Sequence, residues 1–100
     1  MLKKVKAADI IRYMEREAPL CLAEEWDNPG LMIGSPEDEA EGVLLCLDVT
    51  DDIIEEAIKR GCNMIISHHP LIFRPLKNIR GDSGKGSLVM KVIRNYLTVY

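Results

Sequence analysis

The sequence predicts an α/β fold in which βαβ units build a mainly parallel sheet flanked by helices. Two continuous apolar runs, 43–47 and 64–66, have the length of short strands that are covered on both faces. Between them lies a segment with the apolar spacing of a helix. Strand, helix and strand therefore follow one another within about 25 residues, as a parallel βαβ unit requires.

The chain has 100 residues and a mass of 11.3 kDa, so we expect 1–100 to be a single α/β domain or a fragment of a larger one. Apolar residues make up 47%, charged residues 29%, and the net charge is −3. This composition is globular, and it excludes a disordered acidic tail and a basic nucleic-acid clamp. The longest strictly apolar run is 43–47, whereas a membrane helix needs about 20 such residues.

The first element is predicted to be a helix that ends near Pro19. Its apolar residues recur at the spacings of one helix face: Ala7, Ile10, Ile11 and Met14. A short helical turn is expected over 20–25, and the residues at 27–30 are typical of a turn. A short strand over 31–34 and an acidic surface loop over 35–42 complete the first half.

The second helix is predicted to follow the strand at 43–47. Thr50 is expected to cap it, and the next two residues are acids, which a helix N-terminus favours. Gly61 suits the left-handed position just after its last turn. A third helix is expected to be capped by Ser87, and a strand is expected to begin at 97–100, so that the chain stops inside or at the edge of a strand.

The sequence has only two histidines, His68 and His69, and they follow the strand at 64–66 directly. Ligands of open parallel sheets bind beyond the carboxyl ends of the strands, where these two rings should lie. Pro70 favours an extended His69, so we expect the two rings to point to opposite sides. One metal would then be hard to chelate with both rings, and two metals would fit better. The alternative is a turn with one partly buried and one exposed ring.

Asp48 is a candidate third group, because it ends the neighbouring predicted strand and would share the same rim. Turns and helix starts also favour aspartate, and we prefer the interpretation of Asp48 as a turn or capping acid beside Thr50. The glycine-rich stretch before Ser87 lacks the Gly-Lys-Ser/Thr order of a phosphate loop.

The order of these motifs resembles the Nif-three-like family of dinuclear-metal proteins, also called GTP cyclohydrolase type-two homologues. The resemblance runs from near residue 7 to residue 100. The matching stretches are Ala18-Pro19-Leu20, Glu25-Trp26-Asp27-Asn28-Pro29-Gly30-Leu31, Leu47-Asp48-Val49-Thr50, Glu56-Ala57-Ile58 with Gly61, Ile65-Ile66-Ser67-His68-His69-Pro70-Leu71-Ile72-Phe73 and Ile79-Arg80-Gly81.

The resemblance implies a toroidal homo-oligomer, expected to be a hexamer, of two-lobed α/β subunits. It also implies two divalent metals between the lobes, with both histidines of the His-His-Pro motif, here His68 and His69, as ligands. Neutral imidazoles and carboxylates suit Zn, Fe, Mn or Co. Family members supply an Asp after the strand that begins at 97–100, and a further His and a bridging Glu much later. None of these is in this sequence, so the chain resembles the first lobe and holds at most half of the site.

The resemblance further implies a metal-dependent hydrolase or cyclohydrolase acting on a nucleotide-like or phosphorylated small molecule, with the chain alone inactive. The alternative is a metal-binding scaffold or regulatory protein without catalysis. Asp27 and Asn28 are expected near the metal pocket, where they would support the ligands or contact substrate. The odd number of cysteines and the absence of C-x-x-C predict free thiols, and hence the reducing cytoplasm. We expect no membrane partner and no nucleic-acid site.

Overall fold

A short parallel sheet forms the centre of the fold. The computed structural model describes residues 4–23, 28–82 and 84–100. Over these residues the strands lie in the order β1-β2-β3, and both neighbouring pairs are parallel, which confirms the predicted class. The elements in chain order are α1 (Ala7–Glu17), the 3-10 helix η1 (Leu20–Leu22), β1 (Val43–Cys46), α2 (Asp51–Lys59), β2 (Met64–Ser67), α3 (Gly84–Arg94) and β3 (Thr98–Val99).

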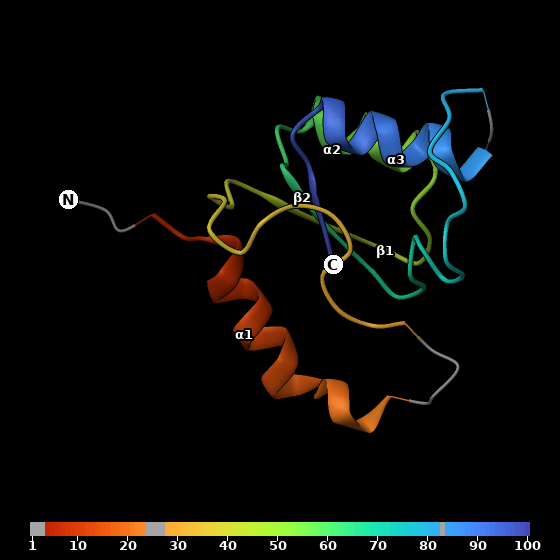
Figure 1. The fold of residues 1–100 in the computed structure, drawn as a ribbon. Helices are drawn as coiled ribbons and strands as arrows, with labels where there is room; N and C mark the ends of the chain where they lie inside the picture. Colours follow the sequence, from red (N-terminus) through yellow and green to blue (C-terminus); the bar gives the residue numbers. More distant parts are fainter. Residues whose placement is uncertain (1–3, 24–27, 83) are drawn as a thin grey trace.

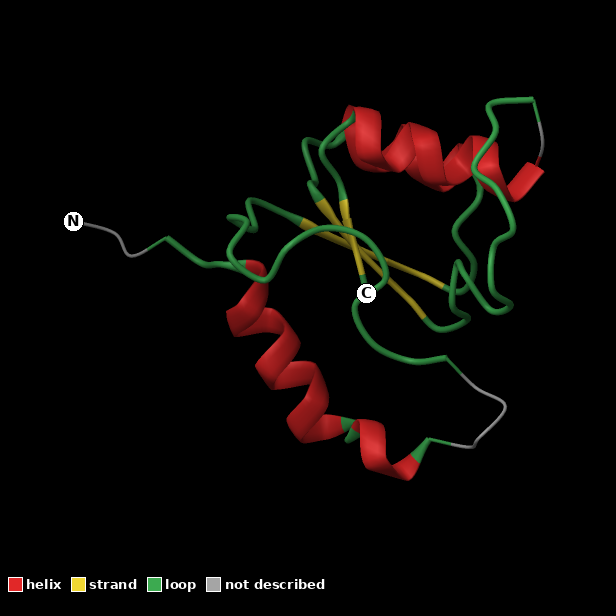
Figure 2. Ribbon diagram, viewed as in Figure 1, coloured by secondary structure: helices red, strands yellow, loops and turns green. Residues whose placement is uncertain are grey.

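The helices cover the sheet from two sides (Figures 1 and 2). Helices α2 and α3 lie together over one face, and α1 lies on the other. Under α2 and α3, the larger core cluster joins helix residues such as Ile54 and Val92 to Ile65 and Val99 of the sheet. Under α1, a smaller cluster surrounds Met64. None of the helices over the described residues is long and apolar enough to cross a membrane.

Strand β2 is the middle strand and sets the register of the sheet. It pairs with β1 from Val43↔Met64 to Cys46↔Ser67 and with β3 through Ile65↔Val99. The far side of β3 receives Ile33 in one antiparallel bridge. The strand predicted over 31–34 is therefore wrong in extent, because this segment meets β3 at a single position instead of running along it.

Strand β1 is covered less completely than its apolar sequence predicts. Leu45 is 72% exposed and Leu47, just past the strand, is 67% exposed. The expectation of cover on both faces is wrong here, because α1 packs near Met64 and Val43 and leaves the face around Leu45 open.

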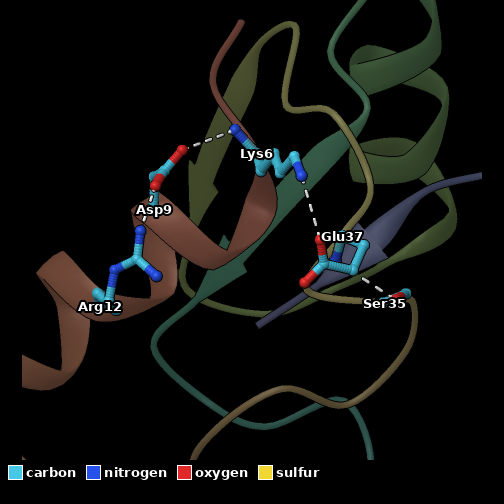
Figure 3. Close-up of polar contacts among 5 residues, drawn as sticks. All are labelled: Lys6, Asp9, Arg12, Ser35 and Glu37. Carbon is cyan, nitrogen blue, oxygen red and sulfur yellow. Dashed lines mark hydrogen bonds and ion pairs between the residues drawn. The ribbon is translucent and has the colours of Figure 1, made fainter.

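Helix α1 begins against the acidic loop over 35–42 (Figure 3). The N–H groups of Ala7 and Ala8 donate to the carbonyl oxygens of Asp38 and Pro36, each over 2.7 Å. The Lys6 N–H donates to the Asp9 carboxylate over 3.0 Å, and the Lys6 ammonium reaches Glu37 over 3.2 Å. The free N–H groups of this helix start are thus satisfied by a distant segment, which fixes α1 to the rest of the fold.

The start of α2 is as predicted and the start of α3 is not. The Ile53 N–H donates to the Thr50 hydroxyl over 3.2 Å, which confirms Thr50 as the cap of α2. Helix α3 already includes Gly84, so Ser87 lies inside the helix and does not cap it. Gly86, in the first turn of α3, is buried.

Helices α2 and α3 end in the same way but with different residues. In α2, Gly61 has a φ of +72° and its N–H donates to Ile58, while the next N–H donates to Ala57. In α3, Tyr96 takes the same position with a φ of +55°, and the same pair of backbone bonds closes the helix. This left-handed conformation suits glycine, as predicted for Gly61, and strains a tyrosine.

We expect Tyr96→Gly to stabilise the protein by about 0.5–1 kcal/mol, because relief of the left-handed strain exceeds the extra entropy of the unfolded glycine chain. Tyr96 is 89% exposed, so little buried area is lost. The free energy of unfolding in urea measures the effect. Tyr96→Ala, which keeps the strain, is the matched control, and equal stability of the two variants would contradict this account.

Candidate metal centre

His68 and His69 lie where the sequence predicts them, just beyond the carboxyl end of β2. The His68 N–H donates to the Cys46 carbonyl over 3.0 Å, and the His69 N–H donates to the Leu47 carbonyl over 2.8 Å. The β1–β2 ladder ends at Cys46↔Ser67, and these two further backbone bonds hold the bend that carries the histidines against the end of β1. Their backbone is held by the sheet, which is a rigid base for a pair of ligands.

The two imidazole rings lie close to each other. Their centroids are 4.9 Å apart and their planes are tilted by 59°. The expectation that the rings point to opposite sides is wrong, because the chain bends at these two residues and is not a straight strand. The Ser67 hydroxyl donates to the His69 carbonyl over 2.8 Å and closes this bend.

Asp48 contacts His69. An oxygen of its carboxylate lies 2.9 Å from the His69 Nδ1. Thr50 provides the cap of α2, so the interpretation of Asp48 as a capping acid is wrong. Asp48 lies in the bend after β1, as the turn interpretation expects, and its carboxylate also reaches His69 at the rim of the sheet. Both side chains are more than half exposed, so the pair contributes little to the stability of the fold.

A pocket of about 360 Å³ opens beside His68, between the end of α1 and the open face of the sheet. His68 lines this pocket, and His69 is not among its lining residues. Most of its wall is apolar. The lining residues are Met14, Ala18, Leu20, Asn28, Pro29, Gly30, Met32, Leu45, Cys46, Ile66, Ser67, His68, Pro70 and Tyr100.

Asn28 joins the two loops that border the pocket. Its side-chain amide donates to the Ile72 carbonyl over 2.6 Å, which links the Asn-Pro-Gly segment to the loop after the histidines. This contact supports the expected position of Asn28 near the site. Asp27, the other residue expected there, lies outside the described residues.

Cys46 lies at the base of the pocket, opposite Ser67 in the register. Burial, and to a smaller extent the charge of Asp48, raises the pKa of the Cys46 thiol. A raised pKa keeps the thiol protonated near neutral pH, and the thiolate is the form that binds metals. Cys46 is therefore harder to ionise than an exposed thiol.

The imidazole and carboxylate side chains at this rim suit a divalent metal, but few of them lie close together. Neutral imidazoles and carboxylates are ligands for Zn, Fe, Mn and Co. Across residues 4–23, 28–82 and 84–100, no three side chains of His, Cys, Asp or Glu lie close enough to hold one metal ion. The histidine pair thus fits part of a metal site, and a complete shell needs further ligands.

Comparison with known proteins assigns the chain to a family. The family model for Duf34/NIF3 (NGG1p interacting factor 3) matches residues 5–100. The chain belongs to this family. A Duf34/NIF3 relative from Clostridium acetobutylicum, called GTP cyclohydrolase 1 type 2 homolog, is 41% identical over 96% of this chain and 36% of its own length. The chain therefore spans about a third of that relative.

Solved structures share the fold of this Duf34/NIF3 chain. The crystal structure of a Bacillus cereus protein related to NIF3 superimposes with a TM-score of 0.93 and 42% identity, over 99% of this chain and 27% of that one. Reduced HcgD from Methanocaldococcus jannaschii superimposes with a TM-score of 0.88 and 30% identity, over all of this chain and 40% of that one.

Sequence reasoning missed the pocket and the bond between Asn28 and Ile72. Both depend on where the end of α1 and the loop after it lie against the sheet, and no local pattern encodes that position. The contact between Asp48 and His69 had a usable signal, because the offset of 21 residues that pairs Val43 with Met64 also relates Asp48 to His69.

We expect Asn28→Ala to loosen the loop after the histidines, since the Ile72 carbonyl loses its donor. Backbone hydrogen exchange around Ile72 should become faster while exchange around Val92 in α3 stays unchanged. Asn95→Ala is the matched control, because it removes the same kind of bond, from the Asn95 amide to the Lys91 carbonyl, away from the site. Equal exchange around Ile72 in both variants would contradict the role given to Asn28.

Proposed function

We propose that His68 and His69 are ligands of a dinuclear divalent-metal site (Zn, Fe, Mn or Co), and that this family member is part of a metal-dependent hydrolase or cyclohydrolase. The observation that carries the proposal is the pair of neighbouring imidazoles at the carboxyl end of the sheet, beside a pocket. Two close metals activate a water molecule and stabilise a developing oxyanion. The histidines then act as ligands and not as acid–base groups.

The spacing of the rings supports two metals. Centroids 4.9 Å apart suit one ligand to each of two ions, which lie about 3.5–4 Å apart in two-metal sites. His68 faces the pocket and His69 faces Asp48, so the two rings have different surroundings. The lining of the pocket favours the position of a substrate on the His68 side.

The pocket bears on the proposed substrate, a nucleotide-like or phosphorylated small molecule. Its described lining is mainly apolar and holds no lysine or arginine. Such a wall suits a neutral ring, such as a base, better than a phosphate. A phosphoryl group would have to be bound by the metals or by residues outside this pocket.

A second candidate function is a metal-binding scaffold or regulatory protein without catalysis. The family description, NGG1p interacting factor 3, names an interaction instead of a reaction.

We further infer a homo-oligomeric ring, a hexamer by resemblance, in which this chain is one lobe of the subunit. The exposed Leu45 and Leu47 support burial of this part of the sheet in a larger assembly. The cytoplasm is the proposed location, and the free thiols of Cys21, Cys46 and Cys62 support it.

The ligand assignment is tested by His68→Ala and His69→Ala, with metal per chain measured by elemental analysis after Zn²⁺ or Co²⁺ loading. Each substitution should weaken metal binding by at least about 100-fold, since even groups that only orient a ligand affect affinity by 10–100-fold. Cys21→Ser is the control, because Cys21 is an exposed thiol that could bind metal adventitiously. Unchanged binding in both histidine variants would sink the assignment.

Catalysis is tested separately, by screening phosphoesters and nucleoside triphosphates with the full-length protein. We expect metal-dependent turnover that either histidine substitution abolishes. A protein that binds metal through these residues and turns over none of these compounds would favour the scaffold function instead.

A further inference from the structure

We propose that Asp48 is a positioning residue that holds the His69 ring in one tautomer and directs its Nε2 atom toward the metal. The direction of Nε2 toward a metal rests on the proposed function. The tautomer of the His69 ring concerns this chain alone. It separates the roles of the two adjacent histidines.

The contact indicates which nitrogen carries the hydrogen. The Asp48 oxygen lies 2.9 Å from the His69 Nδ1. An ionised carboxylate only accepts hydrogen bonds, so Nδ1 must carry the hydrogen and donate it. In a neutral imidazole the other nitrogen then has the free electron pair, and Nε2 becomes the ligand atom.

The backbone brings the two residues to the same rim of the sheet. The β1–β2 pairing ends at Cys46↔Ser67, and Asp48 and His69 each follow two residues later, beside the bond from the His69 N–H to the Leu47 carbonyl. Val49, on the other side of Asp48, is buried in the main core. The backbone on both sides of the contact is therefore fixed by the fold. This distinguishes the contact from one between two mobile surface side chains.

The arrangement favours orientation over ligation by Asp48. A carboxylate bound to the far nitrogen of a metal-binding histidine is a common support in metalloproteins, where it fixes the ring and increases its basicity. Asp48 and the two histidines do not form a group that could hold one metal ion together. The carboxylate is already engaged by the ring, on the side away from Nε2.

The two histidine rings thus differ in the contacts that orient them before a metal binds. The His68 side chain lies beside the His69 ring and lines the pocket. His69 has a carboxylate partner. We therefore expect the His69 ring to be oriented before metal binding and the His68 ring to take its final orientation with the metal.

The tautomer can be measured directly on the metal-free protein by long-range ¹H–¹⁵N NMR correlation of the ring nitrogens. Work at about pH 8 keeps ordinary imidazoles neutral. The sequence has only two histidines, so His68→Ala assigns both ring systems. We expect His69 to carry its hydrogen on Nδ1 and to shift in Asp48→Ala toward the Nε2–H form, which a free histidine side chain prefers. An Nε2–H tautomer in the unsubstituted protein, or no shift in Asp48→Ala, would overturn the proposal.

A second measurement is Zn²⁺ or Co²⁺ affinity. Asp48→Ala should weaken it by about 10–100-fold, and Asp48→Asn, whose amide oxygen still accepts from Nδ1, should lose less. Asp52→Ala removes a nearby carboxylate on the first turn of α2 and should leave affinity and tautomer unchanged. Equal losses in Asp48→Asn and Asp48→Ala, or an equal loss in Asp52→Ala, would mean that only charge matters and would refute the positioning role.

These results separate the two proposals. If neither histidine substitution alters metal binding, the metal function fails, and the tautomer of the metal-free protein still decides the role of Asp48 on the ring. If the histidines bind metal and the tautomer does not depend on Asp48, the metal function stands and the positioning role fails.

Discussion

The hydrogen-bond register of β2 is the constraint on which the rest of the structure depends. Met64 and Ile65 are fully buried on opposite faces of this strand, so β2 belongs to both core clusters at once. A slip of one residue would exchange the faces of every side chain in the strand. His68 and His69 follow the last pair of this register directly and their N–H groups bond to the end of β1, so the packing of the core and the position of the candidate ligands are set together.

Much of the fold could be predicted because its signals are local. The apolar spacing and the Thr50 cap define α2, and Gly61 marks its end. The predictions are wrong where contacts with a segment distant in the sequence determine the exposure or the extent of an element. Leu45 is exposed because α1 packs elsewhere on that face, and the 31–34 segment touches β3 at one position only. Helix α3 starts before Ser87, although Ser87 is the residue type that caps helices.

The candidate site shows the same division. The position of the histidines follows from the end of an apolar run, so the sequence suffices to place them at the rim of the sheet. The approach of the two rings depends on a bend, and neither residue preference nor Pro70 predicts it. The preference of aspartate for turns correctly places Asp48 in the bend after β1, but it does not reveal the contact with His69, which depends on how β1 and β2 pair.

The way α1 begins has a consequence for which sequence changes the fold can absorb. The acceptors for Ala7 and Ala8 are main-chain oxygens of Asp38 and Pro36, and every amino acid carries such an oxygen. A substitution in the 35–42 loop therefore leaves these acceptors present as long as the backbone keeps its course. An insertion or deletion there would move the oxygens away from the helix. The contact between this loop and the start of α1 therefore depends more on the length of the loop than on the identity of its residues.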